Sequence, residues 1–248
     1  MTGCSRHGYA VLDIETMPCP DALSLSPDGG NGHRRIALHR LASVAVISGT
    51  YEDAAFTGTD IRVFTSEEHD EVAMLSFVDH LLPDPFDPSA RVITYNGNEH
   101  DLPLLRLRAG ANWCHSLTNL TAWTEPRRRG RIDLISEGFG SSGARWRLTD
   151  LCAGLGFTTR HGLIAQSVLS LISRERWDAV AEHNMMDAVG TFLAYASHLS
   201  LEANSHRPLA SAWVELARLL EGTDSVNKGS RPIWHHHFVD RARRVMKD

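Results

Sequence analysis

Short hydrophobic runs bounded by turn-forming residues occupy the first 100 positions, and this pattern predicts β-strands. We expect four strands, at Tyr9–Glu15, 41–51, 60–66 and 91–96. A hairpin is expected at Thr57–Gly58, between the second strand and the third. Residues 20–35 are rich in Pro, Gly, Ser and Asp, and therefore predict a long loop.

Apolar residues at helical spacing predict two helices around the fourth strand. The first starts at Ser66 as N-cap, with acidic residues in its first turn, and the second ends near Gly110. The rest of the chain is expected to be mostly helical, in segments 131–140, 147–156, 163–173, 176–199 and 209–222. Strands alternating with helices in this order indicate an α/β fold with a mixed sheet.

The chain has 248 residues, of which 42% are hydrophobic and 22% charged, and this fits one large globular domain. We assign residues 1–204 to that domain. Residues 205–248 are treated as a helical C-terminal appendage, because they are too few to form a core of their own. The amphipathic spacing in this segment suits docking of a second protein, docking of a second copy, or packing within the molecule. The hydrophobic residues concerned are Leu209, Trp213, Leu216, Leu219 and Leu220.

The formal net charge of −5 provides no basic field for passive coating of nucleic acid, but it suits an enzyme whose acidic site holds cations. The spacing of the four cysteines is not typical of a structural zinc site. The sequence has no export signal and no uninterrupted hydrophobic run of about 18 residues. We therefore expect a cytoplasmic protein that does not contact a membrane.

Two carboxylates stand at the end of the first predicted strand. Asp13 and Glu15 are two positions apart, so their side chains point to the same face of the strand. Such a pair repels itself unless a cation lies between the two groups, and oxygen ligands suit Mg²⁺ or Mn²⁺. A solvated strand end that carries two charges is the alternative.

A third carboxylate follows the fourth predicted strand. Asn96 and Gly97 form a tight turn there, and Asp101 lies in the first turn of the next helix. Acidic groups at such strand-to-helix junctions are typical of α/β sites. The alternative is that Asp101 only interacts with the helix N-terminus.

The segment 182–195 adds an imidazole and a fourth carboxylate. His183 and Asp187 are four residues apart, so on a helix they lie on one face and reach the same point. The alternative is an ion pair on the helix surface, which contributes little to stability.

These stretches together resemble the DEDD superfamily of 3′–5′ exonucleases, which have the ribonuclease H-like fold. Within it, the chain is most similar to bacterial predicted exonucleases related to the proofreading domain of family B DNA polymerases. The resemblance covers about residues 9–200. It is carried by "LDIET" at Asp13, "HRLASVAVIS" from His39, "ITYNGNEHDLPLLRLRA" at Asp101, "RIDLI" at Asp133, "RLTDLCAGLGF" from Arg147 and "HNMMDAVGTFLAY" at Asp187.

The resemblance implies that four carboxylates hold two divalent metal ions, Mg²⁺ or Mn²⁺, which activate a water for attack on a phosphodiester. The implied ligands are Asp13, Glu15, Asp101 and Asp187, with His183 as a further catalytic residue. Residues expected to contact the substrate are Thr16, His39, Arg40, Asn96 and Gly97. The expected product is a 5′-nucleoside monophosphate released from a 3′ end.

His183 departs from the pattern of the resemblance. The tyrosine subgroup has a Tyr four residues before the last Asp, and the histidine subgroup has a His five residues before it. Here a histidine stands at the tyrosine spacing, and Glu182 occupies the other position. His183 is therefore expected to act on the attacking water, either as a general base or only as a group that orients it.

The favoured function is a 3′–5′ exonuclease acting on single-stranded ends, with DNA preferred to RNA as substrate. An enzyme of the same fold that degrades RNA or short oligonucleotides is the first alternative. The second alternative is a nuclease that depends on a protein partner, or on a second copy of itself, bound through the C-terminal segment. The third is a module that binds nucleic acid without cleaving it.

Overall fold

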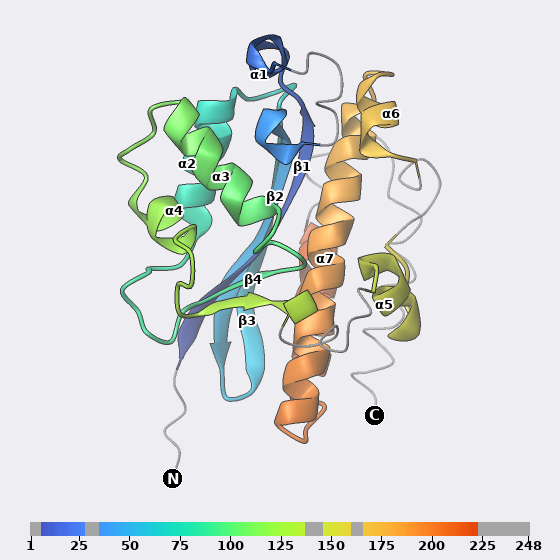
Figure 1. Cartoon of the computed structure of the whole chain (residues 1–248). Coiled ribbons are helices and arrows are strands. Elements are labelled where there is room, and N and C mark those ends of the chain that lie inside the picture. The colour runs from blue at the N-terminus through green and yellow to red at the C-terminus, as the bar shows by residue number, and fades with distance from the viewer. Residues whose placement is uncertain (1–5, 28–34, 137–145, 160–165, 223–248) are drawn as a thin grey trace.

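The computed structural model describes residues 6–27, 35–136, 146–159 and 166–222, and a five-stranded sheet forms its centre (Figure 1). The strands are β1 (His7–Pro18), β2 (His39–Glu52), β3 (Ala55–Thr65), β4 (Arg91–Thr94) and β5 (Arg131–Asp133). Their order across the sheet is β3-β2-β1-β4-β5. β1–β2 and β2–β3 are antiparallel, whereas β1–β4 and β4–β5 are parallel. This mixed sheet confirms the predicted α/β architecture.

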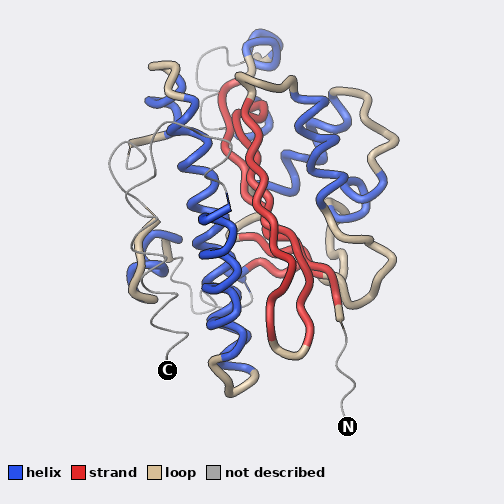
Figure 2. The backbone as a smooth tube through the Cα atoms, turned by 180° about the vertical axis from the view of Figure 1, so that it is seen from behind, coloured by secondary structure: helices blue, strands red, loops and turns tan. Residues whose placement is uncertain are grey.

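Helices cover both faces of the sheet, which lies between them when the molecule is seen from behind (Figure 2). One side carries α2 (Glu71–Leu81), α3 (Asp101–Ala111) and α4 (Thr118–Trp123). On the other side the long α7 (Trp177–Glu202) runs along the sheet, with α5 (Leu148–Gly154), α6 (Val168–Ile172) and α8 (Arg207–Gly222) packed against it or beside it. Two short helices, α1 (Pro20–Leu25) and η2 (Ile36–Leu38), connect β1 to β2. Among the described helices, none is both long and apolar enough to cross a lipid bilayer.

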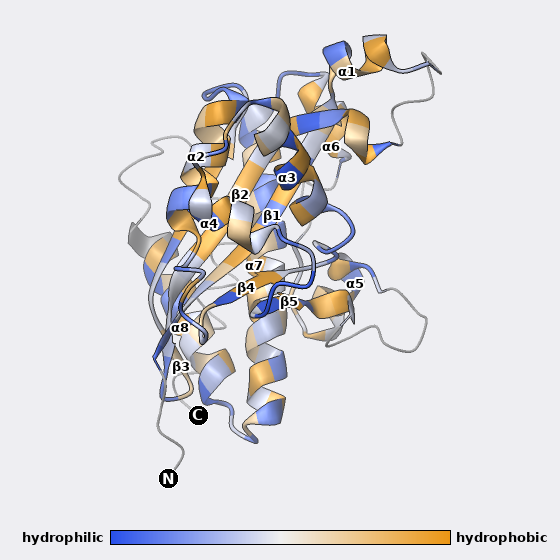
Figure 3. Cartoon of the chain, turned by 60° about the vertical axis from the view of Figure 1, so that its left-hand side comes forward, coloured by the Kyte–Doolittle hydropathy of each residue, from blue (hydrophilic) through white to orange (hydrophobic). Residues whose placement is uncertain are grey.

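The alternation of side chains along β1 divides the interior into two cores. Tyr9 and Val11 are buried among the residues that pack against α7. Ala10, Leu12 and Ile14 belong instead to the core beneath α2, α3 and α4. Figure 3 shows the hydrophobic residues concentrated along the strands and on the helix faces next to them. The odd-numbered positions of β1 therefore define the face that meets α7.

Helix α8 covers the outer edge of the sheet. The backbone N–H groups of Phe56 and Thr59 on β3 donate hydrogen bonds to Ser211 Oγ and Glu215 Oε2, at 2.9 and 2.8 Å. An edge strand otherwise exposes unpaired backbone groups to other chains. Trp213 and Leu216 are buried in the same core as α7. Leu209, Trp213 and Leu216 of the C-terminal segment thus pack within the molecule.

The structure corrects several local predictions. The hairpin turn lies at Asp53–Ala54, both with positive φ angles, and not at Thr57–Gly58, which lie within β3. The cap of α2 is Asp70, whose side chain accepts a hydrogen bond from the N–H of Ala73, and not Ser66. The predicted loop at 20–35 contains α1 instead of being irregular throughout.

Residues 131–133 form a strand where a helix was expected. Three residues carry no measurable periodicity, and their strand conformation comes from pairing with β4. The remaining predicted helices were found at α5, α6, α7 and α8, although parts of the segments 131–140 and 163–173 lie outside the described residues.

Candidate active site

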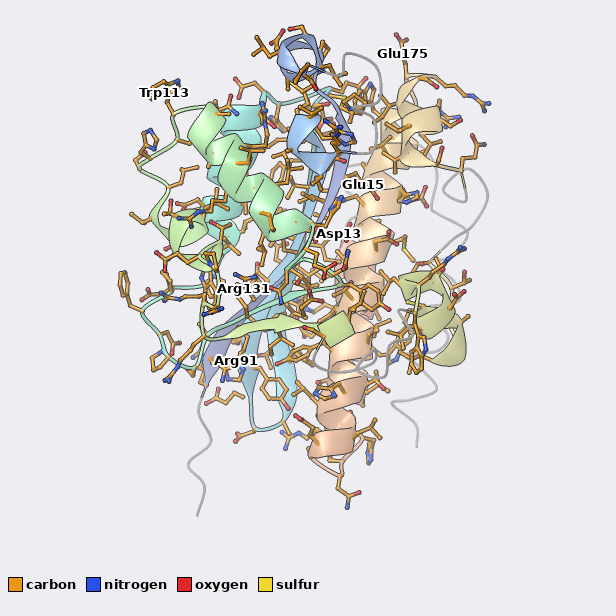
Figure 4. The ribbon with its side chains drawn as sticks, viewed as in Figure 1. Asp13, Glu15, Arg91, Trp113, Arg131 and Glu175 are labelled. Carbon is orange, nitrogen blue, oxygen red and sulfur yellow. The ribbon has the colours of Figure 1, made fainter. Side chains whose placement is uncertain are left out.

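Asp13 and Glu15 continue the face of β1 that meets α7 (Figure 4). Oδ2 of Asp13 accepts a hydrogen bond of 3.1 Å from Nδ2 of Asn184. Oε1 of Glu15 lies 3.4 Å from Nε2 of His183. A bulge follows directly, since the pairing of β1 with β2 shifts register between Glu15 and Thr16. Both carboxylates therefore point at a single short stretch of α7.

On α7, His183 and Asp187 occupy one face, as their spacing predicted. Nε2 of His183 lies 3.8 Å from Oδ2 of Asp187, and both residues are buried. Glu15, His183 and Asp187 each offer one ligand atom such that these atoms all lie within 4.8 Å of one another. The structure thus brings three predicted catalytic residues into one cluster, and the Asn184 contact attaches Asp13 to the same part of α7.

Asn184 was missed by the sequence reasoning. It is fully buried, in the middle of a helix that is apolar on most sides. A signal was available, because Asn184 precedes Asp187 by three residues and a helix places such positions on neighbouring faces. A buried amide has to find a partner, and Asp13 is that partner here.

Asp101 is the first residue of α3, which follows β4, and among the described residues it lies outside the group formed by Glu15, His183 and Asp187. Val11 on β1 pairs in parallel with Ile93 on β4, so the chain leaves β4 one residue later, beside the position of Asp13. Asp101 is only 4% exposed, and its Oδ1 lies 2.8 Å from Nδ1 of His100. Burial raises the pKa of the Asp101 carboxyl, and the hydrogen bond with His100 opposes this rise without cancelling it.

The turn before α3 is held by a carboxylate on the neighbouring strand. Asp133, at the end of β5, accepts hydrogen bonds from the backbone N–H groups of Asn96 and Asn98, at 2.8 and 3.0 Å. Asn96 has a φ of +66°, and a Cβ added to Gly97 would lie 2.4 Å from the side chain of Thr94. Asp133 is therefore the group that fixes this turn.

The other predicted substrate residues lie at the far end of β1. Oγ1 of Thr16 lies 2.9 Å from Nδ1 of His39, which is buried where β2 begins. Arg40 follows on β2, opposite Met17, and is exposed. Thr16, His39 and Arg40 therefore form one group next to Glu15, while Asn96 and Gly97 belong to the turn before Asp101.

The donor set suits a divalent cation. Oδ2 of Asp101 is buried and has no hydrogen-bond partner in the described part of the chain. An isolated buried carboxylate oxygen costs free energy, which a cation would offset. Carboxylates such as Glu15 and Asp187, held close together with one imidazole, are ligands for Mg²⁺, Mn²⁺ and similar ions.

The mixed sheet thus places carboxylates of a central strand opposite those of a long helix. The chain belongs to the family described as "predicted 3′-5′ exonuclease related to the exonuclease domain of PolB", whose model matches residues 31–219. This match confirms the predicted resemblance to 3′–5′ exonucleases of this family. It includes Asp101, His183 and Asp187, begins after β1, and extends into α8.

Solved structures of similar fold include exonucleases and a polymerase. The zinc-bound form of the Escherichia coli ExoI–ssDNA complex has a TM-score of 0.48 and 16% identity, covering 90% of this chain and 45% of that one. Escherichia coli Exonuclease I with a dT13 oligonucleotide has a TM-score of 0.47 and 16% identity, and the match covers 88% of this chain and 44% of that one. The family B DNA polymerase of Pyrobaculum calidifontis has a TM-score of 0.45 and 17% identity, and the match covers 88% of this chain and 29% of that one. No curated protein sequence matches significantly. The chain spans less than half the length of these matched structures.

Proposed function

We propose that this protein is a metal-dependent 3′–5′ exonuclease that shortens single-stranded DNA from its 3′ end and releases 5′-nucleoside monophosphates. The observation that carries the proposal is the convergence of Glu15 from β1 with His183 and Asp187 from α7. Family membership supplies the reaction class, and the described relation to a DNA polymerase domain favours DNA over RNA.

Four carboxylates are the proposed metal ligands, namely Asp13, Glu15, Asp101 and Asp187. When bound, two ions such as Mg²⁺ or Mn²⁺ supply an activated water and stabilise negative charge at the scissile phosphate. The chain itself holds the ligands in place. Asn184 orients Asp13 through its hydrogen bond, and Asp133 fixes the turn that leads to Asp101.

His183 faces the same space as these carboxylates, since its Nε2 is directed at Glu15 and Asp187. Sequence reasoning left two roles for it, namely accepting a proton from the attacking water or orienting that water. Either role requires the imidazole to lie next to the reacting phosphodiester.

Substrate binding is proposed for the two groups that flank the carboxylates. Arg40 is exposed at the start of β2 and offers a positive charge to a backbone phosphate. His39 and Thr16 are hydrogen-bonded to each other beside it. Asn96 and Gly97 shape the turn next to Asp101, where a terminal nucleotide would approach.

The test is a gel assay on 5′-labelled single-stranded DNA and RNA of matched sequence, with Mg²⁺, Mn²⁺ or EDTA. We expect a ladder that shortens from the 3′ end, requires metal, is stronger with DNA, and is absent in Asp187→Asn. Faster cleavage of RNA would move the assignment to an exoribonuclease. Binding of both strands without cleavage under any metal would overturn the proposal in favour of a binding module.

A further inference from the structure

We propose that His183 is itself a metal ligand through Nε2, and that it forms with Glu15 and Asp187 a mixed nitrogen and oxygen site that selects Mn²⁺ over Mg²⁺. This inference rests on the proposed function, because it concerns the same site. In the two roles considered above, His183 acts on the attacking water. In the role proposed here, His183 coordinates the metal ion directly.

The distances between the side-chain atoms support coordination. Two ligands bound to one ion at about 2.1 Å, at angles between octahedral and tetrahedral values, lie about 3.0–3.4 Å apart. Nε2 of His183 lies 3.4 Å from Oε1 of Glu15 and 3.8 Å from Oδ2 of Asp187. The three ligand atoms fit within 4.8 Å of one another. The Glu15 separation falls in that range and the Asp187 separation exceeds it by about 0.4 Å, so a small movement of these side chains would bring the three atoms onto one cation.

The competing arrangement is a protonated imidazole that bridges the two carboxylates. Charge-assisted N–H···O⁻ hydrogen bonds are about 2.7–2.9 Å long. Both contacts of His183 are longer than this, although His183 and Asp187 lie on one helix and Glu15 on the strand packed against it. The separations of the imidazole from these two carboxylates therefore exceed the length of a charge-assisted hydrogen bond.

The helix spacing suits the same conclusion. Two ligands at positions i and i+4 on one helical face are the arrangement by which helices commonly hold transition metals. Imidazole nitrogen suits transition metal ions, whereas Mg²⁺ prefers an octahedral shell of oxygen atoms. A nitrogen ligand at this position therefore raises the affinity of the site for Mn²⁺ relative to its affinity for Mg²⁺.

The matched control lies on the same helix. His198 and Glu202 on α7 are also four residues apart, with Nε2 and Oε1 separated by 3.3 Å. Among the described residues, His198 and Glu202 do not belong to the candidate metal-ligand group, which consists of Glu15, His183 and Asp187. His198→Gln thus removes an imidazole from an equivalent helix pair, outside the proposed site.

The experiment uses the full chain and Mn²⁺ as probe. Electron spin echo spectroscopy of bound Mn²⁺ should detect directly coordinated ¹⁴N in the wild type and in His198→Gln, but not in His183→Gln. Calorimetric titration should show Mn²⁺ affinity falling about tenfold or more in His183→Gln. The Mg²⁺ affinity of that variant should change far less.

Two results would overturn the inference. One is Mn²⁺ bound to the wild type without any nitrogen coupling, a measurement that does not depend on a variant that folds. The other is equal Mn²⁺ affinity in the wild type and His183→Gln. In both cases, metal-dependent shortening of DNA by the wild type would leave the proposed function intact. If the wild type binds Mn²⁺ through nitrogen but cleaves no DNA, the proposed function is wrong and the metal-ligand role of His183 stands.

Discussion

Asn184 on α7 donates a hydrogen bond of 3.1 Å from Nδ2 to Oδ2 of Asp13 on β1, joining two residues 171 positions apart. Asn184 is fully buried, and its Oδ1 has no hydrogen-bond partner among the described residues. The Asn184 side chain thus makes one hydrogen bond to a described residue, as donor to the Asp13 carboxylate. Asp13 is held by the helix that also carries His183 and Asp187.

Replacing Asn184 with Ala should reduce turnover about 10- to 100-fold, because the group that orients a metal-binding carboxylate is lost. The free energy of unfolding should fall by about 1–3 kcal/mol as a buried hydrogen bond disappears. Steady-state kinetics and urea unfolding would measure the two effects. Asn119→Ala is the control, since Nδ2 of Asn119 donates to the carbonyl of Asp79 in another part of the molecule. That variant should lose stability but keep its turnover, and equal turnover in both variants would remove the role of Asn184.

Asp187→Asn should lower turnover by about 10³-fold or more, since metal ions contribute several kcal/mol to stabilising the transition state. Without metal, its melting temperature should be equal to or above that of the wild type, because the repulsion between Asp187 and Glu15 is relieved. Mn²⁺ should raise the melting temperature of the wild type but not of this variant. A metal-free variant that is clearly less stable would indicate that Asp187 serves the fold instead.

Gly97→Ala should disturb the turn before Asp101. Its new Cβ would lie 2.4 Å from Cβ and Oγ1 of Thr94, so the backbone has to shift. We expect a loss of about 1–3 kcal/mol in stability, together with reduced metal affinity. Gly110→Ala at the end of α3 meets nothing within 4 Å and should be neutral or stabilising by up to about 1 kcal/mol. Thermal unfolding of both variants, with and without Mn²⁺, would test this contrast.

The partly buried ion pair between Glu71 and Arg108 should contribute more to stability than an exposed pair. Nε of Arg108 donates to Glu71 Oε1 at 2.9 Å, and the backbone N–H of Leu41 donates to the same atom. Glu71→Ala leaves Arg108 without its partner, and we expect a loss of about 2–3 kcal/mol, between the values for exposed and fully buried pairs. The exposed pair of Arg62 with Asp60 provides the comparison, where Arg62→Ala should cost about 0–1 kcal/mol. Similar losses in the two variants, measured by denaturant unfolding, would contradict the difference in burial.

The sequence predicted those features that arise from regular spacing. Asp13 and Glu15 face one side because strand side chains alternate, and His183 and Asp187 meet because a helix repeats every 3.6 residues. Asp101 was expected in the first turn of a helix, and it is the first residue of α3. Periodicity is a local property, so these features required no knowledge of the tertiary structure.

The missed features depend on partners far away in the sequence. β5 has three residues and forms because β4 pairs with it. The hairpin turn uses Asp53 and Ala54 at positive φ, where glycine would be the usual signal, and Gly58 misled the prediction. The partner of Asn184, Asp13, lies 171 positions away in the sequence. Each of these features is decided by tertiary contacts.

The distance in sequence between Asp13 and Asn184 has a consequence for the order of events during translation. Chains grow at about 5–20 residues per second, so roughly 10–35 s pass between the synthesis of these two residues. β1 and its antiparallel neighbours can pair in that interval, but His183 and Asp187 do not yet exist. Under the proposed function, a nascent chain therefore lacks the α7 residues of the site, His183 and Asp187, until that helix has emerged.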